Sequence, residues 1–297
     1  MPADQTPEES ARQEGGTTVP EQPEWSTIQV GSGVTRILEA GPRQASEATV
    51  FIHGNPGSAG DWVGPVAAVG QIGRAVAFDL PDFGQSEAPP GFGNTVGEYA
   101  AFVGQALDAL GVARVNLVLH DFGGPIGLLW AAGNLDRVAS VTLFNTGILI
   151  GYRWHTMARV WQTPVLGEIS QAIISRPVFR RVVSSAEPRG LPRPFLDEMF
   201  DNYDRRTRSA VLRLYRSARD VGDRATELAT VLAGADIPAL VVWGEGDSYL
   251  PARFAEAQRE AFPSAEIHPL PDSGHWPFID DPDASNVFLT SFLKSLS

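Results

Sequence analysis

The sequence of 297 residues contains no cysteine. This absence excludes disulfides, thiol nucleophiles and thiolate metal sites, and it fits a reducing compartment such as the cytoplasm. Long apolar runs are also missing, because stretches such as 239–243 are far shorter than the ~20 residues that span a bilayer. Basic side chains number 23 against 35 acidic ones, a net charge of −12, so no positive field attracts nucleic acid or an anionic membrane. We therefore expect a cytoplasmic protein that binds neither.

Residues 1–25 hold six acidic side chains, one arginine and almost nothing apolar. This composition predicts a disordered acidic tail. The segment lacks the basic start and apolar middle of a signal peptide, so export is not expected. Because 43% of the whole chain is hydrophobic, the remaining residues can bury a globular core.

From residue 26 onward, short β-branched runs alternate with helical patterns. Strands are expected at 27–30, 35–39, 49–52, 75–79, 115–120, 140–144, 239–243 and 266–270. Those from 49 to 243 are nearly continuous apolar runs, which are typical of strands buried on both faces of a parallel sheet. Helices are expected at 96–110, 123–132, 252–262 and 283–296. The alternation predicts an α/β fold, with a mostly parallel eight-stranded sheet flanked by helices.

One long segment, residues 146–236, breaks this alternation. It has no convincing strand pattern, and its helical stretches are interrupted by several prolines. Because it is inserted between two strands, it is predicted to form a helical cap, or lid, over the carboxyl edge of the sheet, where open α/β folds place their ligand sites. Residues 26–145 and 237–297 would then form the core. The alternative is a helical appendage with no role in binding.

The stretch 115–125 predicts a buried strand that turns sharply into a helix. Asp121 and Phe122 follow the strand, and then Gly123 and Gly124 supply the small residues that the turn needs. This order of strand, turn and helix is typical of a nucleophile elbow, with Asp121 in the place of the nucleophile. Alternatively, Asp121 caps the helix, which is a common position for aspartate.

Three further loops each follow a predicted strand. The segment His-Gly-Asn-Pro at 53–56 offers a backbone N–H near the carboxyl edge of the sheet, which could face a developing oxyanion. Asp247 lies just past a later strand, and His275 lies in the loop after the last one. The order nucleophile, acid, histidine is the chain order of the α/β-hydrolases.

With these motifs the sequence resembles the α/β-hydrolase superfamily, and within it the aspartate-nucleophile branch of epoxide hydrolases and haloalkane dehalogenases. The resemblance extends from about residue 25 to the end and includes a helical cap of the expected length. It implies that Asp121 is the nucleophile, His275 the base and Asp247 the acid that orients His275. It also implies an oxyanion hole made by the backbone N–H groups of Asn55 and Phe122.

A carboxylate nucleophile determines the chemistry that we expect. Aspartate has a reference pKa near ~3.9, so it is ionised at pH 7 and can attack an sp³ carbon directly. Opening an epoxide or displacing a halide leaves an alkyl ester on Asp121. His275 is then expected to deprotonate the water that hydrolyses this ester. The scheme needs neither a metal nor an organic cofactor, and we expect none.

The donor that meets the leaving atom distinguishes the two activities. In the resembled family, cap tyrosines donate to an epoxide oxygen, and Tyr215, in a Tyr-Arg pair late in the cap, is similar to the second of them. Alternatively, Tyr215 packs in an apolar helical stripe. A halide needs N–H donors, typically a tryptophan just after the nucleophile, whereas Phe122 has none. Asn55 is more typical of dehalogenases, in which its side chain contributes a donor to the halide.

We therefore expect hydrolysis of a small apolar epoxide to a vicinal diol. The alternative is haloalkane dehalogenation of a halogenated substrate by the same aspartate, with Asn55 and either Trp154 or Trp161 holding the halide. The first cap tyrosine is harder to place, since Tyr152 lies early in the cap and one of these indoles could replace it. A third alternative is a small-molecule binding protein that keeps the fold without turnover.

The remaining candidates are wall residues of the substrate pocket, although the tryptophans could equally belong to the core. They are His53, Trp62, Tyr152, Trp154, Trp161 and Trp276, with Trp243, Met157 and Phe195 as further possibilities. Among the other histidines, His155 has no partner that the sequence identifies.

Overall fold

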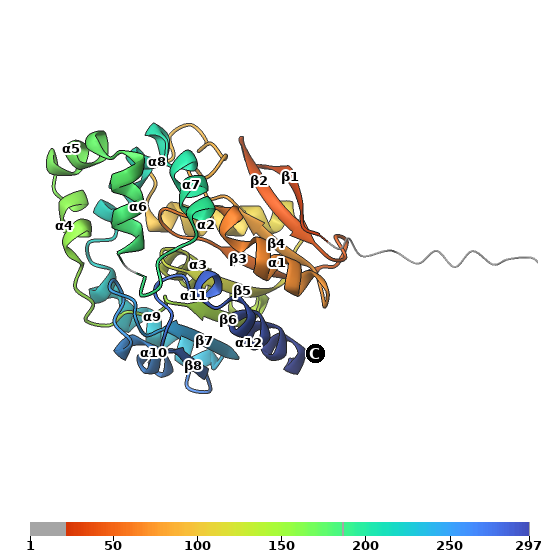
Figure 1. The fold of residues 1–297 in the computed structure, drawn as a ribbon. Helices are drawn as coiled ribbons and strands as arrows, with labels where there is room; N and C mark the ends of the chain where they lie inside the picture. The colour runs from red at the N-terminus through yellow and green to blue at the C-terminus, as the bar shows by residue number, and fades with distance from the viewer. Residues whose placement is uncertain (1–21, 186, 297) are drawn as a thin grey trace, which may run out of the picture.

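The computed structural model describes residues 22–185 and 187–296. At its centre lies a sheet of eight strands in the order β1-β2-β4-β3-β5-β6-β7-β8 (Figure 1). The strands are β1 (Glu24–Val30), β2 (Gly33–Ala40), β3 (Glu47–Ile52), β4 (Ala75–Phe78), β5 (Arg114–His120), β6 (Val138–Phe144), β7 (Ala239–Gly244) and β8 (Glu266–Leu270). All predicted strands are therefore present. Only β1 with β2 and β2 with β4 pair antiparallel, and every other pair is parallel.

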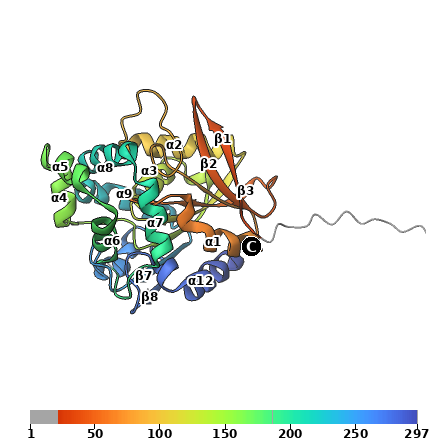
Figure 2. The ribbon, with the colours of Figure 1, turned by 45° about the horizontal axis from the view of Figure 1, so that its top comes forward.

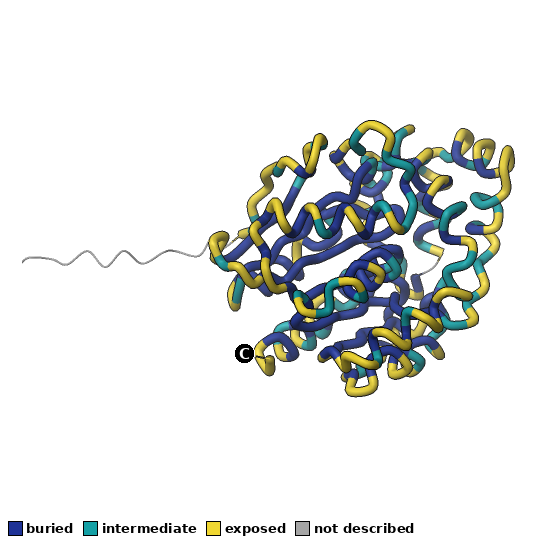
Figure 3. The backbone as a smooth tube through the Cα atoms, turned by 180° about the vertical axis from the view of Figure 1, so that it is seen from behind, coloured by how far each residue is buried: buried dark blue, intermediate teal, exposed yellow. Residues whose placement is uncertain are grey.

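The central strands are buried as their apolar sequences predict. Every residue of β4, β6 and β7 is buried, and in β5 only the first residue is exposed. Seen from behind, these strands form a dark interior under helices whose outer sides are exposed (Figure 3). A parallel sheet needs this covering on both faces.

Two groups of helices cover the sheet on its opposite faces (Figure 1). On one face α1 (Val63–Gly70) contacts α12 (Pro282–Ser295), and on the other α3 (Gly123–Ala132) contacts both α2 (Val96–Ala109) and α9 (Val221–Ala235). Helix α2 begins with a capping box, in which the Thr95 hydroxyl accepts from the Glu98 N–H and the Glu98 carboxylate accepts from the Thr95 N–H. The shorter elements are η1 (Ala59–Trp62), η2 (Leu135–Arg137), α10 (Arg253–Ala257), η3 (Gln258–Glu260) and α11 (Pro277–Asp280).

Between β6 and β7 the described residues form helices and no strand. These are α4 (Thr156–Gln162), α5 (Leu166–Ile173), α6 (Arg176–Ser184), α7 (Arg193–Asn202) and α8 (Arg205–Ser217), followed by α9. In Figures 1 and 2, α4, α5 and α6 lie to one side of the sheet, next to α8. We call α4 to α8 and their connections the cap. Although α9 falls within the predicted cap segment 146–236, it packs against the core helix α3.

Three predictions about individual elements need correction. Most of the predicted tail lies outside the described residues, but β1 begins at Glu24, where Trp25 pairs with Leu38 and its ring lies 3.6 Å from the Arg36 guanidinium. Helix α1 was not predicted, because its eight residues include two glycines and a proline. The helix expected at 252–262 is shorter, since α10 ends at Ala257 and continues as the 3₁₀ turn η3.

Candidate active site

Asp121 occupies the turn between β5 and α3. Its φ of +46° lies in the left-handed region, which residues other than glycine adopt uncommonly. The two glycines after Phe122 allow this turn to pack closely against the neighbouring segments. A Cβ on Gly123 would lie 2.2 Å from the Ile52 carbonyl oxygen, and a Cβ on Gly124 would lie 2.0 Å from Thr146 Oγ1. This is the geometry of a nucleophile elbow.

The alternative role of Asp121 as a helix cap is not observed. The N-cap residue of α3 is Phe122, and no side chain caps this helix. Instead, the Asp121 carboxylate points toward two other loops. Its Oδ1 accepts a hydrogen bond from the Asn55 N–H at 2.7 Å, and its Oδ2 lies 3.5 Å from Nε2 of His275.

His275 lies between two carboxylates, because its other ring nitrogen, Nδ1, is 2.7 Å from Asp247 Oδ2. Asp247 is held firmly in its turn. Its Oδ1 accepts from the backbone N–H groups of Tyr249 at 2.7 Å and Leu250 at 3.0 Å, and its Oδ2 accepts from Asn145 Nδ2 at 2.9 Å. The structure therefore brings Asp121, His275 and Asp247 together in a row.

The charges in this row determine its protonation. Burial alone would lower the pKa of His275, but the charge of Asp247 and the hydrogen bond with Asp121 outweigh it and raise the pKa to about 10. Burial alone would raise the pKa of Asp121 and of Asp247, yet their interactions with His275 leave both pKa values lowered. At pH 7 the row therefore consists of an imidazolium between two carboxylates.

The predicted oxyanion hole lies beside the carboxylate. The Asn55 N–H already donates to Asp121 Oδ1, and the Phe122 nitrogen lies next to Gly54. A Cβ on Gly54 would come 2.2 Å from Asp121 Oδ1 and 2.5 Å from the Phe122 nitrogen, so only glycine leaves this space open. Both backbone donors are thus near the oxygen that would become negative if the Asp121 carbonyl carbon were attacked.

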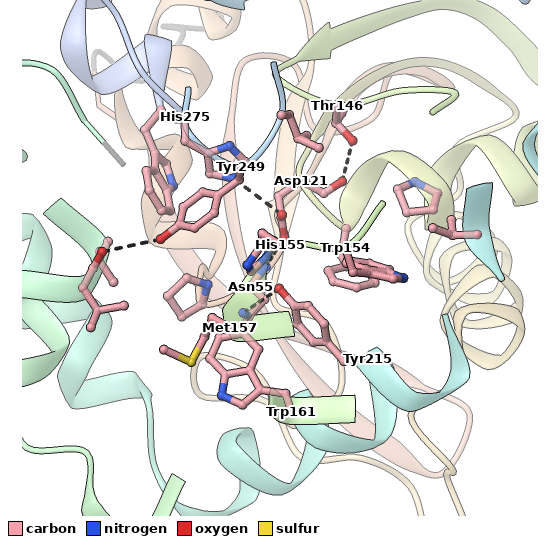
Figure 4. A pocket seen from close by; sticks show the side chains of 18 of the residues that line it. Asn55, Asp121, Thr146, Trp154, His155, Met157, Trp161, Tyr215, Tyr249 and His275 are labelled. Atoms are coloured by element: carbon pink, nitrogen blue, oxygen red, sulfur yellow. Dashed lines mark hydrogen bonds and ion pairs between the residues drawn. The ribbon is translucent and has the colours of Figure 1, made fainter. Parts of the chain in front are cut away.

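A pocket extends from Asp121 into the cap, and apolar and aromatic side chains form most of its wall (Figure 4). Among the described residues that line it, only Asp121 and His275 carry a charge. The aliphatic and sulfur-containing part of the wall is made by Leu149, Met157, Ile174, Val182 and Val183. The pocket is therefore suited to a neutral, apolar molecule.

Tyr215 of α8 reaches into the pocket across from Asp121 and His275 (Figure 4). Its hydroxyl oxygen accepts from Asn55 Nδ2 at 3.4 Å, and its ring packs edge-on against Phe122 and Trp161 with centroids 4.8 Å apart in both cases. Burial, followed by the charge of Asp121, raises the pKa of Tyr215 well above its ordinary value, so the phenol keeps its proton. No acceptor for that proton is found among the described residues.

The other aromatic candidates also line the pocket. Their polar groups differ in whether they already have a hydrogen-bond partner. The Trp154 indole N–H donates to the Arg219 carbonyl at 3.3 Å, and the Tyr152 hydroxyl donates to the Tyr249 carbonyl at 3.3 Å. The Trp161 ring lies against Tyr215, and the Trp276 indole nitrogen is buried without a partner among the described residues. The Trp154 and Tyr152 donors are therefore already engaged.

His53 and Trp62 do not line the pocket, and these two predictions are wrong. Both are fully buried in the core. His53 Nε2 accepts from the Leu80 N–H at 3.0 Å and its Nδ1 faces the Gly54 carbonyl at 2.8 Å, so His53 fixes the backbone before Asn55. Trp62 stacks on Phe278 at 4.3 Å. Trp243 and Phe195 also lie outside the lining, whereas Met157 belongs to it.

Sequence reasoning missed several residues of the site, among them Tyr249, His155 and Thr146. Tyr249 places its ring 5.3 Å from that of His275 and 4.8 Å from that of His155, which begins α4 and accepts from the Ala158 N–H. Thr146 donates to the Asp121 carbonyl at 2.5 Å. Tyr249 and Thr146 could have been found because each follows a predicted strand by a few residues, where the carboxyl edge of the sheet lies. No signal in the sequence identifies His155.

The family model for the alpha/beta hydrolase fold matches residues 48–282, a range that contains the elbow, Asp247 and His275. The chain belongs to the α/β-hydrolase family. Its architecture, an eight-stranded sheet with flanking helices and an insertion after β6, agrees with this assignment.

Several known proteins are similar to this α/β-hydrolase. The dihydrolipoyllysine-residue acetyltransferase component of an acetoin cleaving system from Pseudomonas putida is 29% identical and covers 95% of this chain and 72% of its own length. Haloalkane dehalogenase 2 from Mycobacterium tuberculosis is 28% identical over 79% of this chain and 83% of its own. The crystal structure of haloalkane dehalogenase DbeA from Bradyrhizobium elkani superposes with a TM-score of 0.81 at 22% identity, over 92% of this chain and 98% of that one.

The described part of this α/β-hydrolase contains neither a candidate membrane-spanning helix nor a candidate metal site. None of its helices has the length and apolar character needed to cross a membrane. No group of three or more histidine, cysteine, aspartate or glutamate side chains in that part is arranged to hold a metal ion.

Proposed function

We propose that this α/β-hydrolase converts small, neutral epoxides to vicinal diols through an ester on Asp121. The observation that carries the proposal is the Tyr215 hydroxyl, which faces the pocket with an uncommitted proton while its oxygen accepts from Asn55. Opening an epoxide generates an alkoxide that needs a proton, whereas a departing halide does not. The apolar wall and the lack of an arginine or lysine in it favour a substrate without charge.

In the first step, the Asp121 carboxylate attacks one carbon of the epoxide, and the bond from this carbon to the ring oxygen breaks. The oxygen takes the proton of Tyr215, which leaves a hydroxyalkyl ester on Asp121 and a phenolate on Tyr215. Loss of the Asp121 charge makes the phenolate less costly, since that charge is one cause of the raised pKa of Tyr215.

Ester formation also converts His275 into a base. Esterified Asp121 is neutral, so one of the two carboxylates that raise the pKa of His275 to about 10 is lost. The imidazolium then gives a proton to the Tyr215 phenolate, by way of the hydroxyl group of the hydroxyalkyl ester, and becomes neutral. His275 therefore becomes able to accept a proton only after the ester has formed.

In the second step, neutral His275 takes a proton from water as the water oxygen bonds to the ester carbonyl carbon. The negative charge that forms on the Asp121 oxygen is stabilised by the Asn55 and Phe122 N–H groups. Collapse breaks the bond from the carbonyl carbon to the alkoxy oxygen, which takes the proton of the added hydroxyl group, and the diol is released. The Asp121 carboxylate, the His275 imidazolium and the Tyr215 phenol are all restored.

The second candidate is haloalkane dehalogenation through the same ester, and specific observations favour it. Asn55 Nδ2 points into the pocket near Asp121, where it could donate to a halide, and two of the similar proteins are haloalkane dehalogenases. Against it, Phe122 has no N–H in its side chain and the Trp154 indole already donates to Arg219. Trp161 would have to supply the second donor.

A product assay separates the candidates. Purified protein is incubated with a mixed panel of aryl and alkyl epoxides and bromoalkanes, and diol and free bromide are followed in parallel beside the Asp121→Asn variant. Diol without bromide, absent in the variant, supports the proposal. Bromide without diol reverses the ranking, and turnover that survives Asp121→Asn in protein shown by mass not to have deamidated disproves both.

A further inference from the structure

Three consecutive backbone polar groups at Gly274 and His275 each have a side-chain hydrogen-bond partner. The Gly274 N–H donates to Asp280 Oδ2 at 2.7 Å, the His275 N–H donates to Glu187 Oε1 at 2.7 Å, and the His275 carbonyl faces His120 Nε2 at 2.8 Å. Asp280 and His120 belong to the core, on α11 and at the end of β5. Glu187 does not, since it lies in the connection between the cap helices α6 and α7.

Glu187 reaches the core as a buried acid. The residue is 7% exposed, and no N–H or O–H donor among the described residues reaches its second oxygen, Oε2. The carboxyl group of Asp280 is one of the causes that raise the pKa of Glu187.

The surroundings favour the protonated form of Glu187. Burial and the carboxyl group of Asp280 raise the pKa of Glu187 to about 9, and only His275 opposes them. Besides Asp280 and His275, the titratable group that faces Glu187 is Tyr249, which follows Asp247. A protonated Glu187 still offers its carbonyl oxygen to the His275 N–H.

We propose that Glu187 is a positioning residue for His275, through which the cap fixes the backbone of the base. The inference rests on the proposed function of His275 as the base of ester hydrolysis. Glu187 does not touch the reacting atoms, so it should act on the second chemical step and leave the attack by Asp121 unchanged. It also means that this base is fully supported only when the cap is in place.

The two steps can be measured separately. Stopping a single turnover with acid and weighing the intact protein gives the rate at which the ester forms on Asp121 and the rate at which it disappears. We expect Glu187→Ala to slow ester hydrolysis about tenfold or more, since a buried donor loses its partner, and to change ester formation by less than about threefold. Glu187→Gln keeps an oxygen for the His275 N–H and an N–H₂ for Asp280, so it should retain both rates.

A matched control is Arg189→Ala, two residues further along the same connection. Arg189 is exposed and pairs with Asp272 at 2.9 Å, so this change disturbs the cap loop without touching His275. If Arg189→Ala and Glu187→Ala slow both steps equally, Glu187 has only a structural role and the proposal is wrong. If Glu187→Ala does not fold, Glu187→Asp replaces it, because its shorter side chain cannot reach the His275 N–H.

A measurement without substrate separates failure of this inference from failure of the proposed function. In proton NMR spectra the His275 Nδ1–H that bonds to Asp247 is expected far downfield in the wild type and in Glu187→Gln. Its loss or broadening in Glu187→Ala supports the positioning role even if no epoxide or bromoalkane is turned over. An unchanged resonance and an unchanged rate of ester hydrolysis in Glu187→Ala would overturn it.

Discussion

The side-chain amide of Asn55 donates to the phenolic oxygen of Tyr215 over 3.4 Å and so connects the loop after β3 to the cap helix α8. Both groups face the pocket beside Asp121. A leaving atom displaced by Asp121 would therefore meet an O–H donor from the cap and an N–H donor from the core. The two proposed activities depend on these donors differently, because only an alkoxide must gain a proton.

Replacing Tyr215 with phenylalanine removes the O–H donor and keeps the ring packing. We expect Tyr215→Phe to lower kcat/KM for epoxide opening by about 10²-fold or more, the usual contribution of a positioned acid. Bromide release from a bromoalkane, where it occurs, should fall far less. Stopped-flow ester formation with one epoxide and one bromoalkane measures both effects.

Tyr203→Phe is the matched control for this change. Tyr203 is another buried cap tyrosine that lines the pocket, but its hydroxyl accepts from Gln171 Nε2 at 2.8 Å. Its removal should leave epoxide opening within about threefold of the wild type, since no reacting atom loses a donor. Equal losses in the two variants would show that Tyr215 only packs.

Asn55→Ala tests the other donor. It deletes the side-chain amide but keeps the backbone N–H that donates to Asp121 Oδ1. Under the epoxide proposal, the rate of diol formation should fall by about tenfold at most, because one neutral hydrogen bond is lost. A loss of bromide release much larger than the loss of diol formation would favour the dehalogenase candidate. Parallel steady-state assays on both substrates give the comparison.

His275→Gln should trap the ester. Asp121 remains ionised and can attack, but no base is left to activate water, so the reaction should stop after one equivalent. Mass spectrometry of the intact protein is expected to show an increase equal to the mass of one epoxide, with the added mass on the peptide that contains Asp121. A variant that turns over at the wild-type rate would exclude His275 as the base.

Most of the fold could be predicted from the sequence because parallel strands that are buried on both faces need continuous apolar runs. β5, β6 and β7 carry this signal plainly, and so does the elbow after β5. Helix α1 carries no comparable signal, since two glycines and a proline fall within eight residues and only tertiary packing keeps them helical. Trp25 was assigned to the tail for a similar reason, because its pairing with Leu38 depends on a distant strand.

The candidate site was predictable where a residue follows a strand, and not where it depends on the packing of the cap. Asp121, Asp247 and His275 each lie just beyond a strand, so their meeting at one edge of the sheet follows from topology. Whether a tryptophan faces the pocket or the core depends on the rotation of helices. Trp62 and Trp161 therefore could not be distinguished by sequence, although the first is core and the second lines the pocket.

The contributions of Glu187 and His275 to the stability of the protein should fall as the pH rises from about 4.5 to 10. Folding raises the pKa of Glu187 from 4.5 to about 9 and that of His275 from 6.5 to about 10. For both groups the folded state holds a proton that the unfolded state has lost, so each contribution is complete below the unfolded pKa and disappears as the pH passes the folded pKa. Thermal unfolding from pH 5 to pH 10, compared between the wild type and variants at these two positions, separates these contributions from the opposite contributions of His53 and His155, whose pKa values are lowered to about 4.

Two variants separate the contributions of Glu187 and His275, because the pH ranges over which these two groups affect stability overlap only in part. Glu187→Gln should remove a downward contribution to the slope from about pH 4.5 to 9, and below pH 6.5 this contribution does not overlap with that of His275. His275→Gln should leave the range below pH 6.5 unchanged and flatten the range from 9 to 10. Each removes at most one proton, about 1.4 kcal/mol per pH unit of slope. A Glu187→Gln curve parallel to that of the wild type below pH 6.5 would mean that Glu187 is ionised in the folded protein.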